Sequence, residues 1–147
     1  MKLFKTDEDI ANLAFDVFNE TGLAQLGISL KVMSVNKSRE ILKISKANAT
    51  TEFLTNSDDI ICLYIFQSVF DKLTDEQKII LLEGIFTRVF FDTEKDKLII
   101  NSDQYYDVFS MGKKYGNHYV ETLETAYLIK ESVEEELNKN KEKKVKK

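Results

Sequence analysis

His118 is the first residue whose chemistry matters, because it is the only histidine in the 147-residue chain. Any Ser-His-Asp or Cys-His catalytic arrangement must therefore use this imidazole as its general base. His118 follows Gly116 and Asn117 in a short polar break between two longer segments. That context favours a surface turn, so we interpret His118 as an exposed side chain and not as a catalytic base.

Carboxylates in the second half of the chain form another candidate group, because oxygen ligands suit hard cations such as Ca²⁺ and Mg²⁺. The group comprises Glu83, Asp92, Glu94, Asp96 and Asp103. Their spacing does not follow the Asp-x-Asp-x-Asp-Gly series of a calcium-binding loop. We interpret these side chains as solvated charges. A hydrolase that places Glu83, Asp103 or His118 around an atypical metal site stays an alternative.

Tyrosines and lysines gather in the last third of the chain and form a candidate interaction surface. Tyrosine beside lysine or arginine is typical of protein interfaces and of surfaces on which nucleic-acid bases stack. The competing interpretation packs the rings in the core with their hydroxyls at its rim. The residues of this predicted surface are Tyr105, Tyr106, Lys113, Lys114, Tyr115 and Tyr119.

The elements that must position these residues centre on one apolar strand and one apolar helix. Ile60–Phe66 is a nearly continuous apolar run, which predicts a strand covered on both faces. Thr74 and Gln77 have the spacing of a helix capping box. Apolar residues from Ile79 to Phe91 cover almost the whole circumference of a helix, which predicts a buried central position. Cys62, the only cysteine, lies inside the strand, so we expect a small buried side chain in a reducing compartment.

The flanking segments predict further helices and strands. The N-terminal half is expected to hold a helix capped at Thr6 and stopped at Gly22, strands near Ile28–Met33 and Ile41–Ser45, an irregular or helical connection over Lys46–Thr55, and two helical turns over Gln67–Leu73. The C-terminal half is expected to hold a loop or hairpin over Asp92–Lys97, a helix from about Ser102 to Tyr115, and a helix from about Tyr119 to Asn138.

The stretch from Asp58 to Arg88 resembles a family of zincin-like phage metallopeptidases where those proteins carry their zinc helix. In that family an apolar strand and a short segment precede an LT(D/E)EQ motif and a helix that opens LLxHELxH. Here LTDEQ occupies residues 73–77, and the helix opens with Leu81-Leu82-Glu83-Gly84-Ile85-Phe86-Thr87-Arg88. The resemblance spans roughly Lys46 to Gly116.

The resemblance places the family's functional positions on residues that lack the required chemistry. The two histidine positions fall on Gly84 and Arg88, and the catalytic glutamate position falls on Ile85. Glycine has no ligand atom, isoleucine cannot accept a proton, and arginine is a permanent cation without a free lone pair. A third histidine position falls on Asp103, and one carboxylate is short of the three protein ligands of a catalytic zinc site. The resemblance therefore implies a degenerate member without peptidase activity and without a cofactor.

The net charge of −4 is unevenly distributed along the chain. Residues 139–147 hold six lysines and one glutamate and carry +5, so the rest carries −9. An acidic body argues against a nucleic-acid platform, and the lysine-rich tail is expected to be solvated or frayed. No stretch approaches the about 20 apolar residues of a membrane span, and the N-terminus lacks the apolar segment of a signal peptide. Abundant Lys, Ile, Asn and Glu without Pro or Trp is typical of an AT-rich genome, which a phage can have.

These observations predict one α+β domain over residues 1–138, followed by the tail of residues 139–147. The expected architecture is a zincin-like core, in which a small sheet packs on a buried central helix between N- and C-terminal helices. The expected function is that of a non-catalytic phage protein that contacts itself or other virion proteins, in the host cytoplasm or the virion. A small phage regulator that binds a host protein or nucleic acid is the second hypothesis, and the atypical hydrolase is the third.

Overall fold

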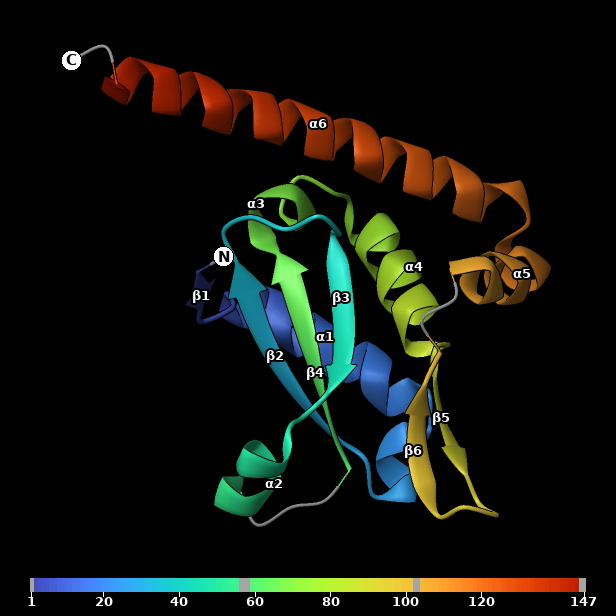
Figure 1. Ribbon diagram of the computed structural model, residues 1–147. Coiled ribbons are helices and arrows are strands. Elements are labelled where there is room, and N and C mark those ends of the chain that lie inside the picture. The colour runs from blue at the N-terminus through green and yellow to red at the C-terminus, as the bar shows by residue number, and fades with distance from the viewer. Residues whose placement is uncertain (1, 56–58, 102–103, 146–147) are drawn as a thin grey trace.

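Helices and strands are interspersed along this chain and form a mixed α+β fold (Figure 1). The computed structural model describes residues 2–55, 59–101 and 104–145. The strands are β1 (Leu3–Phe4), β2 (Ser29–Val35), β3 (Leu42–Lys46), β4 (Ile60–Phe66), β5 (Val89–Asp92) and β6 (Lys97–Ile100). The helices are α1 (Glu8–Glu20), the short 3₁₀ helix η1 (Leu23–Leu26), α2 (Ala49–Thr55), α3 (Gln67–Phe70), α4 (Asp75–Phe86), α5 (Gln104–Tyr115) and α6 (Asn117–Val145).

The larger sheet has the strand order β1-β2-β4-β3 within the described residues. β2 runs parallel to β4, whereas β1 and β3 are antiparallel to their neighbours. The strand predicted over Ile60–Phe66 is β4, and its central position explains why it is apolar along its whole length. The predicted α+β class and this strand are therefore confirmed.

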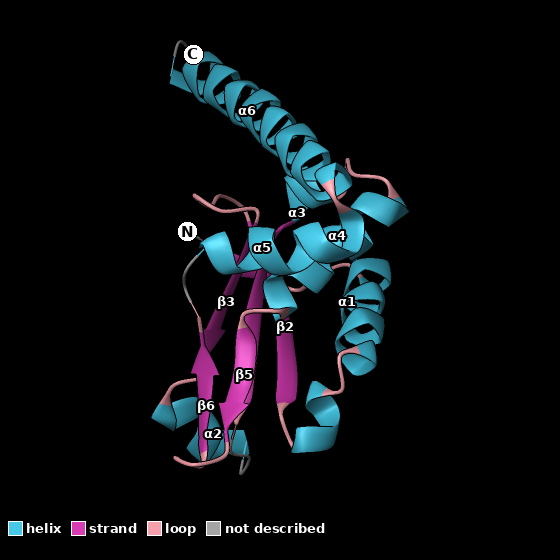
Figure 2. Ribbon diagram, turned by 90° about the vertical axis from the view of Figure 1, so that its right-hand side faces the viewer, coloured by secondary structure: helices cyan, strands magenta, loops and turns pink. Residues whose placement is uncertain are grey.

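One face of the sheet forms the main hydrophobic core. The strand register places Leu30, Ile61 and Ile44 on this face, and all three are buried. Figure 2 shows α1 on the same side of the sheet, and its Ala14 and Phe18 belong to the same core cluster. Because side chains alternate across a strand, the residues between these positions project to the opposite face. That opposite face carries Lys31, Met33, Lys43, Ser45, Cys62 and Tyr64.

Helix α4 begins at the predicted capping box but ends five residues earlier than predicted. Thr74 Oγ1 accepts a hydrogen bond from Gln77 N at 3.2 Å, and Thr74 N donates to Gln77 Oε1 at 3.0 Å. The prediction of helix up to Phe91 is wrong, because Val89–Asp92 forms strand β5 and pairs with β6. β-Branched and aromatic residues favour a pleated strand, and the all-round apolar pattern did not distinguish a helix end from a strand.

The start of α1 also differs from the predicted cap. Thr6 does not cap the helix; Asp7 stands at the N-cap position, and its side chain makes no capping hydrogen bond. The Thr6 hydroxyl is buried and lies 2.9 Å from Ser34 Oγ, which is also 2.9 Å from Gln67 Oε1. These polar contacts join the start of α1 to β2 and α3. The predicted stop at Gly22 is confirmed, with a left-handed φ of 80°.

Helix α6 continues well beyond the predicted end at Asn138. It runs to Val145 and includes most of the lysine-rich segment, so the expectation of a frayed end is wrong for residues 139–145. The expected solvation is confirmed for residues 139–144, whose side chains are all exposed. Among the side chains of α6 that the structure describes, the last buried one is Val133, and Figure 1 shows the C-terminal end of the helix extending away from the sheet. Lysine and glutamate are good helix formers, and Lys143 and Lys144 in the last turn offset the negative end of the helix dipole.

The remaining predicted segments agree with the structure in type and differ at their ends. The connection over Lys46–Thr55 contains α2, the Asp92–Lys97 loop joins the β5–β6 hairpin, and the predicted two turns over Gln67–Leu73 contain only the short α3. Strand β1 and the 3₁₀ helix η1 had no counterpart in the sequence prediction. None of the described helices has the length and apolar character that a bilayer crossing requires.

Candidate functional site

The positions that the resemblance assigns to zinc chemistry lie at the C-terminal end of α4. Gly84 and Ile85 are both buried, and Ile85 is 5% exposed within the main core. Arg88 lies past the end of the helix, where its carbonyl accepts a hydrogen bond from Asn101 N at 2.8 Å. Positions 84 and 88 therefore do not share a continuous helical face, which the paired ligands of a zinc helix require. Asp103 lies outside the described residues.

The space beside Gly84 is filled by the ring of Tyr119. A Cβ atom placed on Gly84 would lie 2.6 Å from the Tyr119 hydroxyl oxygen and 3.2 Å from Tyr119 Cε2. Tyr119 is 3% exposed and packs with Ile80 and Met111 in a second core cluster. Its assignment to the candidate interaction surface is therefore wrong, because helical periodicity turns this residue of α6 toward α4. The α4 surface at Gly84 is a closed contact between two helices.

Glu83 is the centre of a polar cluster on the neighbouring face of α4. Its Oε2 atom accepts hydrogen bonds from Tyr115 Oη at 2.8 Å and Lys114 Nζ at 3.0 Å. The Glu83 side chain is only 18% exposed, so its interpretation as a solvated charge is wrong. The carboxylate is desolvated by the approach of α5 and balanced by two donors from that helix.

The cluster favours the protonated forms of both donors. The hydrogen bond to Glu83 raises the pKa of Lys114. Burial, followed by the same carboxylate, raises the pKa of Tyr115. Lys114 therefore stays a cation and Tyr115 a neutral phenol near neutral pH, and neither is activated as a base or nucleophile.

A cavity of about 440 Å³ lies beside this cluster, between α1, α4 and α5. Its apolar lining includes Phe86, Val89 and Met111, and its polar lining includes Glu83 and Lys114. Among the side chains that the structure describes, no three His, Cys, Asp or Glu residues gather closely enough to hold a metal ion.

Three other carboxylates of the candidate group, Asp92, Glu94 and Asp96, lie in the β5–β6 hairpin. Asp92 Oδ1 accepts hydrogen bonds from Glu94 N at 3.0 Å and Lys95 N at 3.3 Å, which fixes the turn. Glu94 and Asp96 are exposed, as predicted. Asp92 therefore has a structural role in the hairpin, away from Glu83 and its partners.

His118 lies in the first turn of α6 and not in a surface turn. Its side chain is 47% exposed, so the predicted exposure is confirmed and the predicted turn is wrong. The ring Nε2 atom lies 3.2 Å from Glu76 Oε1, and Nδ1 lies 3.9 Å from Glu121 Oε2. The contact with Glu76 joins the first turn of α6 to the first turn of α4, whereas Glu121 lies one turn further along α6.

The predicted tyrosine-rich surface is divided by the structure. Tyr115 is half-buried against Glu83, whereas Lys113 and Lys114 are exposed. Lys113 Nζ lies 4.6 Å from the centre of the Phe109 ring, and Phe109 is 66% exposed. Tyr105 and Tyr106 lie in α5, and their side chains are outside the described part of the structure. The six residues do not form one continuous exposed surface, because Tyr119 is buried.

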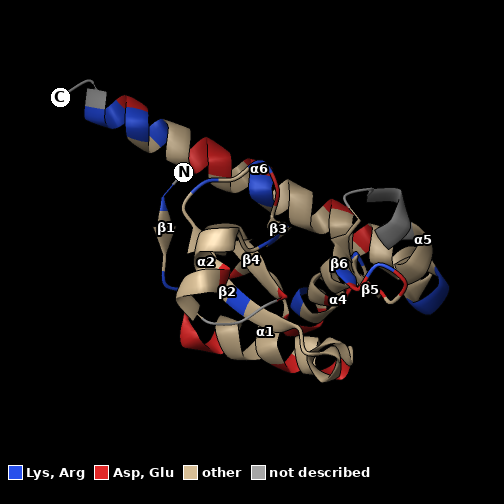
Figure 3. Cartoon of the chain, turned by 60° about the horizontal axis from the view of Figure 1, so that its bottom comes forward, with Lys and Arg blue, Asp and Glu red and all other residues tan. Residues whose placement is uncertain are grey.

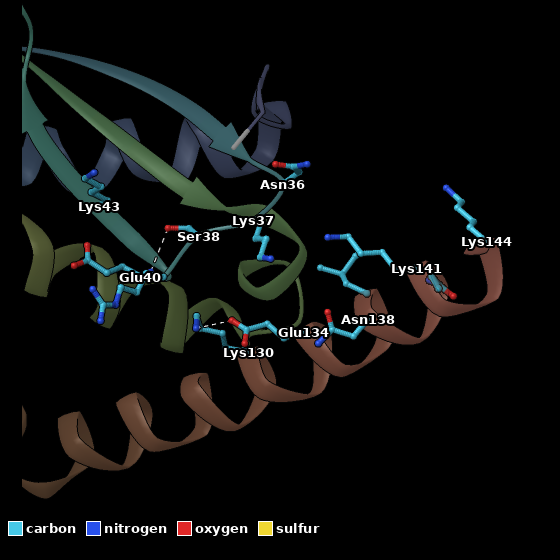
Figure 4. Close-up of a pocket in the computed structure, with 13 residues that line it drawn as sticks. Asn36, Lys37, Ser38, Glu40, Lys43, Lys130, Glu134, Asn138, Lys141 and Lys144 are labelled. Atoms are coloured by element: carbon cyan, nitrogen blue, oxygen red, sulfur yellow. Dashed lines mark hydrogen bonds and ion pairs between the residues drawn. The ribbon is translucent and has the colours of Figure 1, made fainter. Parts of the chain in front are cut away.

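A basic groove that the sequence analysis missed lies between α6 and the β2–β3 connection. It has a volume of about 1000 Å³, and we call it the α6 groove (Figure 4). Within the described residues its cationic side chains are Lys37, Arg39, Lys43, Lys130, Lys141 and Lys144, and its acidic side chains are Glu40 and Glu134. The division between an acidic body and lysine-rich residues 139–147 was visible in the sequence. The sequence did not show that α6 places Lys141 and Lys144 in the same groove as Lys37 and Arg39.

Comparisons with known proteins do not place the chain in a family. No protein-family model, no curated protein and no solved structure matches it. The geometry of the described residues is therefore the basis for a functional proposal.

Proposed function

We propose that this protein is a degenerate zincin-like protein without hydrolytic activity, which acts by contacting other proteins. In this proposal it is a phage component of the virion or the host cytoplasm, with virion proteins or further copies of itself as partners. The order of elements supports the zincin-like part. Strand β4, the short α3, the capping box at Thr74 and helix α4 follow one another as the resemblance implies.

The packing of Tyr119 on Gly84 is the observation that carries the proposal. A metal ligand at position 84 needs a side chain and free space, and Tyr119 fills that space. Ile85, at the position of the catalytic glutamate, faces the main core, where a carboxylate without a partner would be strongly destabilising. In this proposal the positions of the family's ligand and catalytic glutamate are occupied by core packing, which fits a chain retained for its shape.

Metal content and hydrolysis test the non-catalytic part. The full chain would be purified without chelator, its zinc content measured by mass spectrometry, and its activity measured on a library of quenched fluorescent peptides. We expect a zinc content well below one ion per chain. We also expect a rate of peptide hydrolysis no higher than that of buffer alone. Stoichiometric zinc lost in a Glu83→Gln variant, or hydrolysis that follows the protein through purification, would overturn the proposal.

Self-contact is tested separately by sedimentation over a range of protein concentrations. A reversible shift from monomer to larger species would identify a second copy of the chain as a partner. A monomer at all concentrations would exclude self-contact and leave other virion proteins as the proposed partners.

A further inference from the structure

The α6 groove collects positive charge on a molecule whose remaining surface is acidic. One wall is the β2–β3 connection with Lys37 and Arg39, and the other is the C-terminal half of α6 with Lys141 and Lys144. Figure 4 shows Lys37 and Lys141 approaching each other from the two walls. Figure 3 shows lysines concentrated toward the C-terminal end of α6, whereas acidic residues lie along α1. The groove is therefore a local positive site, with walls that concentrate its field.

The acidic side chains of the groove, Glu40 and Glu134, are fewer than its six cations, so the groove keeps a net positive charge. Lys130 pairs with Glu134 at 2.6 Å, so these two charges balance each other. In the described part of the chain, no carboxylate lies within ion-pair distance of the remaining five cations. These are Lys37, Arg39, Lys43, Lys141 and Lys144. Like charges on facing walls repel each other, and an anion between the walls relieves that repulsion.

We propose that the α6 groove binds an acidic segment of a protein partner. This inference rests on the proposed function, because it names the chemistry of the partner that the non-catalytic protein contacts. Carboxylates of the segment would pair with the cations of both walls. The side-chain amides of Asn138 and Asn140 would donate to and accept from its peptide groups, since an amide carries both donors and an acceptor.

A peptide suits this groove better than a nucleic acid for two reasons. No aromatic side chain lines the groove among the described residues, so bases have no stacking surface. In addition, residues 1–138 have a net charge of −9. A nucleic acid that extends beyond the groove would place its phosphates next to this acidic surface, which repels them. A protein segment can confine its negative charge to the residues that lie in the groove. The observations therefore favour a short acidic stretch with uncharged flanks.

Binding of a defined acidic peptide to the full chain tests the inference. The probe is a short fluorescent glutamate-rich peptide, its matched control has glutamine in place of glutamate, and the readout is fluorescence anisotropy. We expect binding of the glutamate peptide that weakens steeply with salt, and no binding of the glutamine peptide. Absence of binding at low salt would overturn the inference and leave the proposed function standing, since metal content and hydrolysis test that separately.

A pair of charge-matched variants locates the binding. Lys37→Glu with Lys141→Glu reverses one cation on each wall, and both side chains are exposed, so the fold is expected to persist. Lys95→Glu with Lys97→Glu makes the same change of net charge in the β5–β6 hairpin, outside the groove. We expect the groove variant to weaken peptide binding roughly tenfold or more, and the hairpin variant about twofold or less. Equal weakening by both variants would show a general charge effect and overturn the assignment.

Duplex and single-stranded DNA serve as competing probes under the same conditions. We expect weaker binding of either DNA than of the glutamate peptide at equal ionic strength. If DNA binds more tightly and only the groove variant loses that binding, the groove is a nucleic-acid site and the proposed acidic partner is wrong.

Discussion

The hydroxyl oxygen of Tyr119 occupies the position that a side chain at Gly84 would need, 2.6 Å from an ideal Cβ atom at that residue. The contact joins the first turn of α6 to the last part of α4. It also makes two arrangements mutually exclusive, since a ligand-bearing residue at position 84 and the present position of Tyr119 cannot coexist. The type of residue at position 84 is therefore coupled to the packing of the C-terminal helix.

Replacement of Gly84 by alanine is expected to destabilise the protein. The new methyl group would force Tyr119 or α6 to move, and overpacking of this kind costs about 1–3 kcal/mol. The better helix propensity of alanine offsets roughly 0.5–1 kcal/mol of that cost. We expect a net loss of about 1–2 kcal/mol in the free energy of unfolding, measured by urea denaturation.

Gly112 provides the matched control for this substitution. It is also helical, in α5, but nothing lies within 4 Å of its ideal Cβ position. Gly112→Ala is expected to stabilise by about 0.5–1 kcal/mol. In a double-mutant cycle, Tyr119→Phe should recover part of the loss caused by Gly84→Ala, because it removes the closest atom. Equal effects of the two glycine substitutions would contradict the close contact at Gly84.

The capping box at Thr74 is expected to make a measurable contribution to stability. Thr74→Ala removes the acceptor of the hydrogen bond from Gln77 N, and loss of such a cap costs about 1 kcal/mol. Thr93→Ala in the exposed β5–β6 turn is the control and should change stability by less than about 0.5 kcal/mol. Thermal and urea unfolding of both variants check this. An unchanged unfolding midpoint for Thr74→Ala would show that the capping box does not contribute to the stability of α4.

Local signals in the sequence were sufficient for the capped helix and the buried strand. The capping box depends on two residues three apart, and Ile60–Phe66 is apolar throughout, so each pattern had one simple interpretation. Val89–Asp92 shows the limit, because an apolar run next to a buried helix has the same periodicity whether it continues the helix or starts a strand. Only pairing with Lys97–Ile100, a contact between separate segments, settles the choice.

The candidate site was less predictable because it depends on contacts between distant segments. Glu83 and Tyr115 are 32 residues apart in the sequence, and no local pattern predicts that Glu83 accepts a hydrogen bond from Tyr115. Tyr119 looked like an interface residue from composition and is a core residue by position in α6. The α6 groove needs both the unpaired cations of the β2–β3 connection and the extension of α6 to Val145. The sequence showed which residues are charged but not that the two segments lie next to each other in the fold.

Cys62 is expected to react slowly with thiol reagents in the folded protein. Its side chain is 7% exposed, and burial raises the pKa of the Cys62 thiol, although the nearby Lys31 cation opposes this shift. The reactive thiolate is therefore disfavoured near neutral pH. Reaction with an aromatic disulfide reagent, followed by absorbance, should be slow without denaturant and fast in urea.

The Lys31→Ala variant tests whether the positive charge of Lys31 lowers or raises the pKa of the Cys62 thiol. Without the cation the thiol pKa should rise further, so the reaction should slow at a given pH, whereas Lys97→Ala should leave it unchanged. Faster reaction of Lys31→Ala would mean that the lysine shields the sulfur and does not favour its thiolate. The raised pKa also implies that the folded state loses stability as pH increases above the about 8.5 of an unfolded cysteine.

The Glu83 cluster predicts a loss of stability in alkaline solution. The pKa values of Lys114 and Tyr115 are both raised in the folded protein, Lys114 chiefly by its hydrogen bond to Glu83 and Tyr115 chiefly by burial. Groups with a raised pKa bind more protons in the folded state than in the unfolded state. Their stabilising contribution is complete below the unfolded pKa values of about 10 and is lost as pH rises through the folded values.

Glu83→Gln should reduce this alkaline dependence without removing it. Glutamine still offers an oxygen to the Tyr115 hydroxyl but no charge to either donor, so the pKa of Lys114 should return toward its usual value. The pKa of Tyr115 should stay raised, because its burial is unchanged. Urea midpoints between about pH 9 and about pH 11 should therefore fall less steeply for Glu83→Gln than for the parent.

Glu94→Gln is the control, since it removes the same charge from the exposed β5–β6 turn. Its pH profile should match that of the parent. A profile for Glu83→Gln that also matches the parent would mean that the Glu83 hydrogen bonds do not persist in solution. The cavity beside Glu83 would then be lined by an uncompensated carboxylate, and binding of a cationic small molecule there would become the better hypothesis.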